Sequence, residues 1–236
     1  MNVLWSKVLR HIYSRKSLII YEYTMHGLAS SILEPVDGLV CKELRPEEWK
    51  GIEEVLAMQR AAETIFEPAF DAAEAYERLR DGGYCFVCED KGRIVGYTWF
   101  AAGEKYITEI QSTIRLKERE VYAYNAYVAR SYRGNNIFRD LLITGARALY
   151  LRGFTGGLAA AMVWNGATRA ILPRVAFSET GRVTVGYFLT IRYMINTCRG
   201  ISFVSSVGPL EFYKKLFRKL STVLSRVGAA ADMWLV

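Results

Sequence analysis

The chain has 236 residues, of which 51% are apolar and 23% charged, and its formal net charge is +7. This length and composition fit one large globular domain with extensions and exclude a disordered chain. The positive charge suits an anionic partner, such as nucleic acid, an anionic membrane surface, or a polyanionic nucleotide or coenzyme, and does not choose among them.

The apolar runs and the cysteines exclude two further classes. The longest apolar runs, SLIIYEY and GGLAAAMVW, fall short of the roughly 20 residues of a transmembrane helix, and the basic N-terminus lacks the apolar core of a secretory signal. Cys85 and Cys88 have an odd spacing on a predicted strand, so they point to opposite faces and do not form a metal site. With Cys41 and Cys198 they are expected to be free thiols, in a cytoplasmic protein without a metal.

Two predicted extensions flank the main domain. Apolar residues recur at helical spacing over 3–14, and a strand-like run follows before the break LEPVDG, so residues 1–35 are interpreted as an N-terminal extension. The main domain is placed at 36–208, and 209–236 is predicted to be a basic amphipathic helix and tail. We expect both basic ends to dock on the core; contact with a membrane surface, an acidic partner or a second subunit stays open.

The main domain reads as alternating strands and helices. Strands are predicted at 39–44, 84–90, 94–102, 105–111, 121–129, 156–164 and 182–195, and helices at 45–62, 70–83, 137–153 and 165–177. The order is strand, two helices, an antiparallel meander, helix, strand, helix, strand. It predicts a mixed α/β (α+β) domain with a mostly antiparallel central sheet flanked by helices.

The stretch SYRGNNIF, residues 131–138, connects a predicted strand to a predicted helix. Gly134 allows a close backbone approach, and Asn135 and Asn136 tolerate left-handed backbone. The backbone N–H groups at the start of the helix, together with Arg133 beside them, form a candidate binding site for a diphosphate. The alternative is a plain turn with solvated arginines. The chain has neither a P-loop nor a GxGxxG motif.

At these residues the sequence resembles the GNAT superfamily of acyl-CoA-dependent N-acetyltransferases. YVARSYRGNNIFRDLL is similar to the family's strand, diphosphate-binding turn and helix, with Asn136 and Phe138 where Gly and Gly or Ala are usual. VWNGATRAILPRVAF is similar to a second family segment, with Asn165 at its Asn position. The resemblance is expected to cover roughly two thirds of the chain. It implies that two neighbouring strands separate at the cofactor site.

The resemblance also implies which residues bind the cofactor, acetyl-CoA. Tyr127 and Val128 would contact the pantetheine arm, and Asn165 and Arg169 would line the other side of the gap. The diphosphate contacts would come from the turn and the helix start: Arg133, Gly134, Asn135, Asn136, Ile137 and Phe138.

Two positions that usually carry the acid and base of this family differ here. The central strand has Tyr124 and Asn125 in place of a carboxylate, and the short helix has Leu172 in place of a Tyr. Tyr124 and Asn125 are the candidate catalytic residues, with packing of Tyr124 on the sheet as the alternative. Glu109 and Glu120 are further candidates for a base that acts through water.

The leading hypothesis is therefore an N-acetyltransferase that moves an acetyl group from acetyl-CoA to a primary amine of a small molecule, such as an amino sugar or amino acid. The alternative is a catalytically silent GNAT-like module that binds acyl-CoA or a protein partner. Nucleic-acid binding is not expected, because the aromatic residues interleave with apolar residues rather than with a basic stripe. A homodimer stays open.

Overall fold

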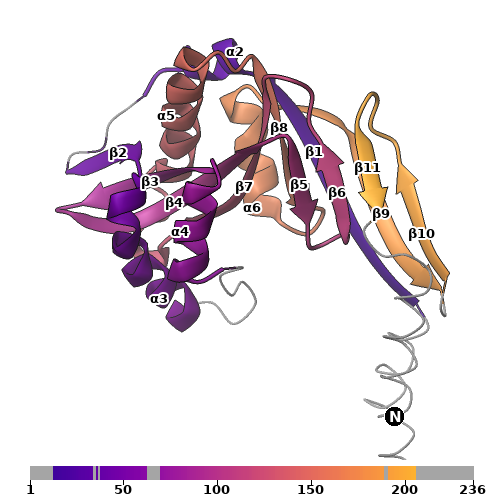
Figure 1. Ribbon diagram of the computed structural model, residues 1–236, viewed down its shortest axis with the longest axis horizontal. Helices are drawn as coiled ribbons and strands as arrows, with labels where there is room; N and C mark the ends of the chain where they lie inside the picture. The colour runs from indigo at the N-terminus through magenta and orange to yellow at the C-terminus, as the bar shows by residue number, and fades with distance from the viewer. Residues whose placement is uncertain (1–12, 34–35, 37, 63–69, 189–190, 206–236) are drawn as a thin grey trace, which may run out of the picture.

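The computed structural model describes residues 13–33, 36, 38–62, 70–188 and 191–205 (Figure 1). The predicted amphipathic segment at 3–14, apart from its last two residues, and the predicted C-terminal helix lie outside these ranges. Within the described ranges, no helix is long and apolar enough to cross a membrane.

An eight-stranded sheet forms the centre of the molecule, with the strand order β10-β9-β1-β8-β7-β4-β3-β2. Its neighbours pair antiparallel, except for the parallel pair β7 and β8. This arrangement confirms the predicted mixed α/β fold with a mostly antiparallel sheet. The strands are β1 (Tyr13–Thr24), β2 (Leu39–Glu43), β3 (Tyr84–Asp90), β4 (Arg93–Ala102), β7 (Glu120–Val128), β8 (Gly156–Met162), β9 (Ser178–Phe188) and β10 (Ile191–Asn196).

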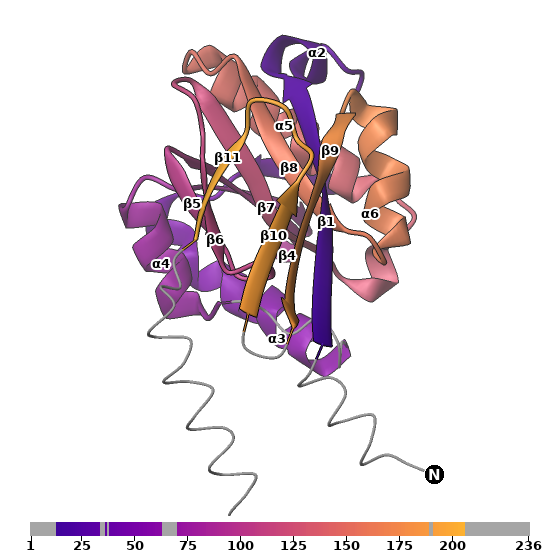
Figure 2. The same ribbon diagram turned by 90° about the vertical axis from the view of Figure 1, so that its right-hand side faces the viewer.

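The first strand lies in the middle of this sheet rather than at its edge. β1 pairs with β8 on one side and with β9 on the other, as Figure 2 shows. Ile19 and Ile20 point to opposite faces, and both are buried, which explains why the strand reads as a continuous apolar run. The strand assigned to the N-terminal extension is thus integral to the sheet, while the boundaries at 35 and 208 stay predictions.

Helices cover both faces of the sheet (Figure 1). On one face, α2 (Met25–Ala29), α5 (Ile137–Leu151), α6 (Gly166–Ile171) and the 3₁₀ turn η3 (Leu172–Val175) enclose one apolar cluster. On the other, η1 (Pro46–Gly51), α3 (Ile52–Ala62) and α4 (Ala72–Arg80) enclose a second. Cys88 lies in the first cluster and Cys85 in the second, so the two thiols point apart as expected.

A small second sheet packs over a third apolar cluster, against β1, β8 and β9. It consists of β5 (Glu104–Ile107), β6 (Ser112–Arg115) and β11 (Ser202–Ser205), in the order β11-β6-β5. The prediction that 105–111 extends the main meander is therefore wrong, because this segment turns away into the small sheet. The prediction of one long strand over 182–195 is also wrong, because β9 and β10 pair antiparallel with each other.

Candidate active site

The parallel strands β7 and β8 separate before they end. Residues Glu120–Ala123 of β7 pair with residues Gly156–Ala159 of β8, and the pairing ends there. Beyond this point β7 continues along β4 to Val128, and β8 continues along β1 to Met162. The two strands therefore splay at their carboxyl ends, and beyond this point no described strand pairs with their facing edges. This is the splayed pair that the family resemblance implied.

A β-bulge shapes the splayed end of β7. The register with β4 shifts between Tyr97 and Trp99, so Asn125 and its neighbour share one partner position. Asn125 has φ 45°, a left-handed conformation that Asn tolerates better than most residues. The bulge turns Tyr124 and Tyr127 to the same side of the strand, although they are three residues apart. The structure thus gives Asn125 a backbone role.

The turn after β7 leaves an open helix start. The 3₁₀ turn η2 (Arg130–Tyr132) is followed by Gly134, which has φ 90°, and a Cβ added to this glycine would meet no atom within 4 Å. Asn136 is the N-cap residue of α5 and adopts the left-handed conformation, and its side chain makes no capping hydrogen bond to the N–H groups of the helix. Residues 133–136 are exposed. The first turn of α5 therefore presents its backbone donors, with their partial positive charge, beside this exposed turn.

Side chains of the turn fix its position against β7. Arg133 donates from Nε to the Val128 carbonyl at 3.1 Å, and its guanidinium lies 5.8 Å from the centre of the Tyr127 ring. Ile137 is buried, and Phe138 packs against the same apolar cluster. These two side chains are directed toward the core, so Phe138 occupies apolar space on that side of the helix start.

The residues predicted across the gap hold the end of β8 to α6. Asn165 accepts a hydrogen bond from the Thr168 N–H at 3.2 Å and so caps α6. Arg169 donates from Nη1 to the Val163 carbonyl at 2.8 Å. Trp164, which sequence reasoning did not select, directly precedes Asn165 and has 58% of its surface exposed. The turn after β7 and the cap after β8 lie at the same end of the parallel pair.

Tyr124 lies in an aromatic and cationic environment. Its ring stacks near Tyr122, with centroids 6.2 Å apart, and lies 6.5 Å from the Trp99 ring. The Lys105 Nζ lies 4.1 Å from the Tyr124 ring centre, and the Arg78 guanidinium lies 5.6 Å from it. Burial raises the pKa of Tyr124 to about 12 against the opposing charge of Arg78. The hydroxyl therefore stays protonated at neutral pH and can serve as a proton donor.

The other residues considered from the sequence lie farther from this constellation. Glu120 begins β7 at the opposite end and pairs with Lys117 at 3.4 Å. Burial, and to a smaller extent the negative charge of Glu109, raise the pKa of Tyr122. Leu172 is buried in the core beside η3.

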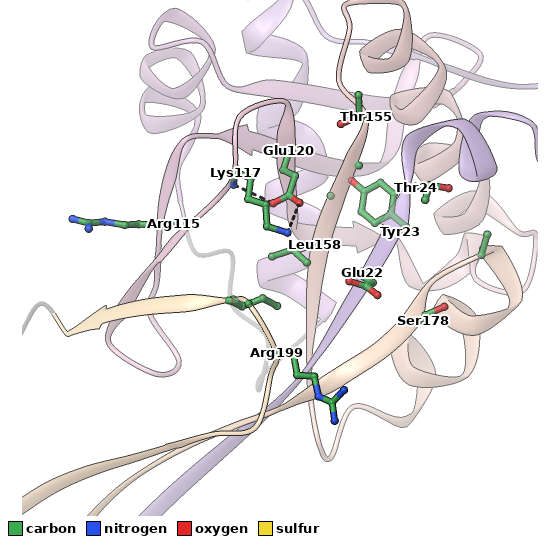
Figure 3. A pocket seen from close by; sticks show the side chains of 15 residues that line it. Glu22, Tyr23, Thr24, Arg115, Lys117, Glu120, Thr155, Leu158, Ser178 and Arg199 are labelled. Carbon is green, nitrogen blue, oxygen red and sulfur yellow. Dashed lines mark hydrogen bonds and ion pairs between the residues drawn. The ribbon is translucent and has the colours of Figure 1, made fainter.

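A separate cavity of about 520 Å³ lies at the amino ends of β7 and β8 (Figure 3). Its lining includes Glu22, Leu158 and the ion pair of Lys117 with Glu120, while Arg199 lies at its margin. Because β7 and β8 are parallel, this cavity is at the opposite end of the pair from the splay and the exposed turn. Of the residues considered from the sequence, Glu120 lines this cavity, and the predicted cofactor-binding residues and Tyr124 and Asn125 do not.

The structure also shows which metal-ligating and cationic side chains are grouped near the predicted site residues. Among the described residues, no three His, Cys, Asp or Glu side chains are grouped so as to hold a metal ion. Arg78 and Lys105 escaped sequence reasoning because they come from α4 and β5, and only the packing of these elements on the sheet brings them to Tyr124.

Comparison with known proteins places this geometry in a family. The model of the acetyltransferase (GNAT) family matches residues 49–172, a segment that holds the splay, the exposed turn and the Asn165 cap. No curated protein matches the chain.

Solved structures resemble the fold at low sequence identity. A functionally unknown conserved protein from Staphylococcus epidermidis has a TM-score of 0.50 and 12% identity, over 80% of this chain and 68% of that one. A Drosophila protein has a TM-score of 0.50 and 11% identity, over 76% of this chain and 53% of its own. An aminoglycoside acetyltransferase from an uncultured soil metagenomic sample has a TM-score of 0.47 and 16% identity, over 59% and 88%.

Proposed function

Because the chain belongs to the acetyltransferase (GNAT) family, we propose that it transfers an acetyl group from acetyl-CoA to a primary amine of a small molecule, such as an amino sugar or an amino acid. The family assignment carries the acyltransferase activity as a class. The amine acceptor, the residue roles and a cytoplasmic location are parts of the proposal. The location is supported by Cys41, Cys85, Cys88 and Cys198, all four of which are free thiols.

One observation carries the proposal: an exposed helix start, uncapped by a side chain, stands beside the splayed ends of two parallel strands. In the proposed complex, backbone N–H groups of residues 134–138 bind the diphosphate, and Arg133 adds a positive charge. The pantetheine arm lies along β7 at Tyr127 and Val128, with Asn165 and Arg169 across the gap. The thioester is then directed toward Tyr124.

The chemistry assigned to this chain follows from the state of Tyr124. The neutral amine attacks the thioester carbonyl and forms the C–N bond, and the tetrahedral intermediate collapses with cleavage of the C–S bond. The coenzyme A thiolate takes a proton as it leaves, and the attacking nitrogen loses its extra proton to solvent water, from which the proton donor is recharged. Tyr124 is the proposed donor of that proton, because it lies on β7 just beyond the point where β7 and β8 separate, and its hydroxyl is protonated at neutral pH. Asn125 supports this role through the bulge that orients Tyr124.

The second candidate function is a silent module that binds acyl-CoA without turnover. It is favoured by the side chains around Tyr124. The carboxylate whose charge reaches Tyr124 is that of Glu74, and this carboxylate accepts from Arg78 at 2.7 Å and 3.1 Å. It is therefore engaged and is not free to act as a base in this arrangement.

Two measurements on the full chain test the proposal. Calorimetry with acetyl-CoA at near-physiological salt tests the cofactor site, and absence of binding would contradict both candidate functions. A thiol-release screen over amino sugars, amino acids and polyamines then tests catalysis. Amine-dependent release of coenzyme A supports the acetyltransferase, whereas binding without release supports the silent module.

A further inference from the structure

Two cations and one aromatic side chain converge where the acceptor amine would meet the thioester. Lys105 comes from β5 of the small sheet, Arg78 from α4 and Tyr124 from β7. The Lys105 Nζ lies 4.1 Å from the centre of the Tyr124 ring, and the Arg78 guanidinium lies 5.6 Å from it. Three elements that are separated in the sequence thus place two positive charges on one ring.

Only one of these charges is matched by a carboxylate within the described part of the chain. Glu74 pairs with Arg78 through its Nε and Nη2 atoms. The remaining nitrogen of Arg78, Nη1, is buried and has no hydrogen-bond partner. Lys105 makes no ion pair with any described carboxylate. Among the described residues, the surroundings of Tyr124 therefore carry one positive charge that no carboxylate matches.

The positions of the two side chains explain why this unmatched positive charge is unfavourable. Arg78 is enclosed by the rings of Phe70, Trp99 and Tyr124, at 4.4, 5.5 and 5.6 Å from their centres. Burial, and next the charge of Arg78, lower the pKa of the Lys105 ammonium. The contacts with the rings attract the cations without neutralising them. A bound anion would neutralise this charge and give the unpaired donors an acceptor.

We propose that Lys105 binds an anionic group of the acceptor, so that the amine substrate carries a carboxylate or a phosphate and is not a polycation. This inference rests on the proposed acetyl transfer and gives that site its substrate class. Lys105 is the contact residue because it is only partly buried and makes no ion pair with a described carboxylate, whereas Arg78 lies behind the rings and is paired with Glu74. A polycationic amine would be repelled by Lys105.

The test uses acceptor pairs that differ only in the anionic group. An amino sugar is compared with its 6-phosphate, and an amino acid with its amide, in a thiol-release assay with acetyl-CoA. We expect the anionic member of one pair to have a kcat/KM about 10- to 100-fold higher, as for a close pair of charges in a partly buried site. The pair that shows the preference distinguishes phosphate from carboxylate.

Lys105→Gln should remove most of this preference, so that the ratio of kcat/KM between the two members of a pair falls toward one, while the affinity for acetyl-CoA is unchanged. Lys50→Gln is the matched control, because Lys50 also lies over a ring, that of Trp49 at 5.9 Å, but on the exposed η1. An equal loss for both members of a pair in Lys105→Gln would overturn the proposal. Higher activity with neutral or polycationic amines would do so as well.

If the protein acetylates none of these amines, the inference is tested by measuring how tightly it binds them. Calorimetry of the CoA-loaded protein with the same pairs should show tighter binding of the anionic member and loss of this difference in Lys105→Gln. Equal binding of both members would contradict the inference. Failure to bind acetyl-CoA at all is a separate result, which contradicts the proposed function itself.

Discussion

Gly134→Asp tests the diphosphate seat directly, because it adds a negative charge at the exposed turn without a steric clash. A Cβ at this position meets no atom within 4 Å, but φ is 90°, so a non-Gly residue costs about 1–2 kcal/mol of folding free energy. A carboxylate about 5 Å from a seated phosphate repels it by about 1–3 kcal/mol at effective dielectric constants of about 80 to 20. The dissociation constant for acetyl-CoA should therefore rise about 5- to 150-fold.

Gly134→Asn is the matched control for this experiment. Asn has nearly the same shape as Asp and shares its tolerance of left-handed backbone, but it carries no charge. Calorimetry at two salt concentrations should show weaker binding for the Asp variant than for the Asn variant, with a difference that shrinks at high salt. Equal dissociation constants for the two variants would refute the placement of the diphosphate at this turn.

Three further substitutions test other parts of the account. Arg133→Gln removes a positive charge beside the proposed seat, so calorimetry should show acetyl-CoA binding about 10-fold weaker and less sensitive to salt; unchanged affinity would argue against this contact. The pKa of Tyr124 is about 12 in the folded protein, against an ordinary tyrosine value of 10.0, so its stabilising effect is present below about pH 10 and is lost as the pH rises toward about 12. Tyr124→Phe should flatten this alkaline fall in urea unfolding between about pH 10 and 12, and an identical slope would contradict its burial. Gly145→Ala places a Cβ 2.5 Å from Cε2 of Phe100, and we expect a destabilisation of about 1–3 kcal/mol, whereas Gly166→Ala, with open space around it, should be nearly neutral; equal thermal midpoints would refute the packing argument.

Local patterns in the sequence were sufficient for the elements that form the cofactor side of the site. The aromatic strand, the Gly and Asn turn and the helix after it have the predicted order, and Gly134 and Asn136 adopt the positive φ angles that their residue types favour. Asn125 in the middle of a strand was an available signal for the bulge, since an Asn there is unusual unless the backbone is left-handed.

Long-range pairing was not accessible from the same patterns. An apolar run such as that of β1 (Tyr13–Thr24) indicates burial on both faces, but it does not say which strands it will join, and β1 lies between β8 and β9. The segment 182–195 carries no Gly or Pro signal where β9 ends and β10 begins. Lys105 reaches Tyr124 only because the small sheet packs on the central one. The proposed acceptor side of the site therefore depends on the tertiary structure.

The most direct test of the central claim is calorimetric titration of the full chain with acetyl-CoA at near-physiological salt. The account predicts one site whose affinity falls with added salt and falls further in Gly134→Asp than in Gly134→Asn. No detectable binding by the wild-type chain would contradict the claim that the exposed turn at the start of α5 is a coenzyme A site.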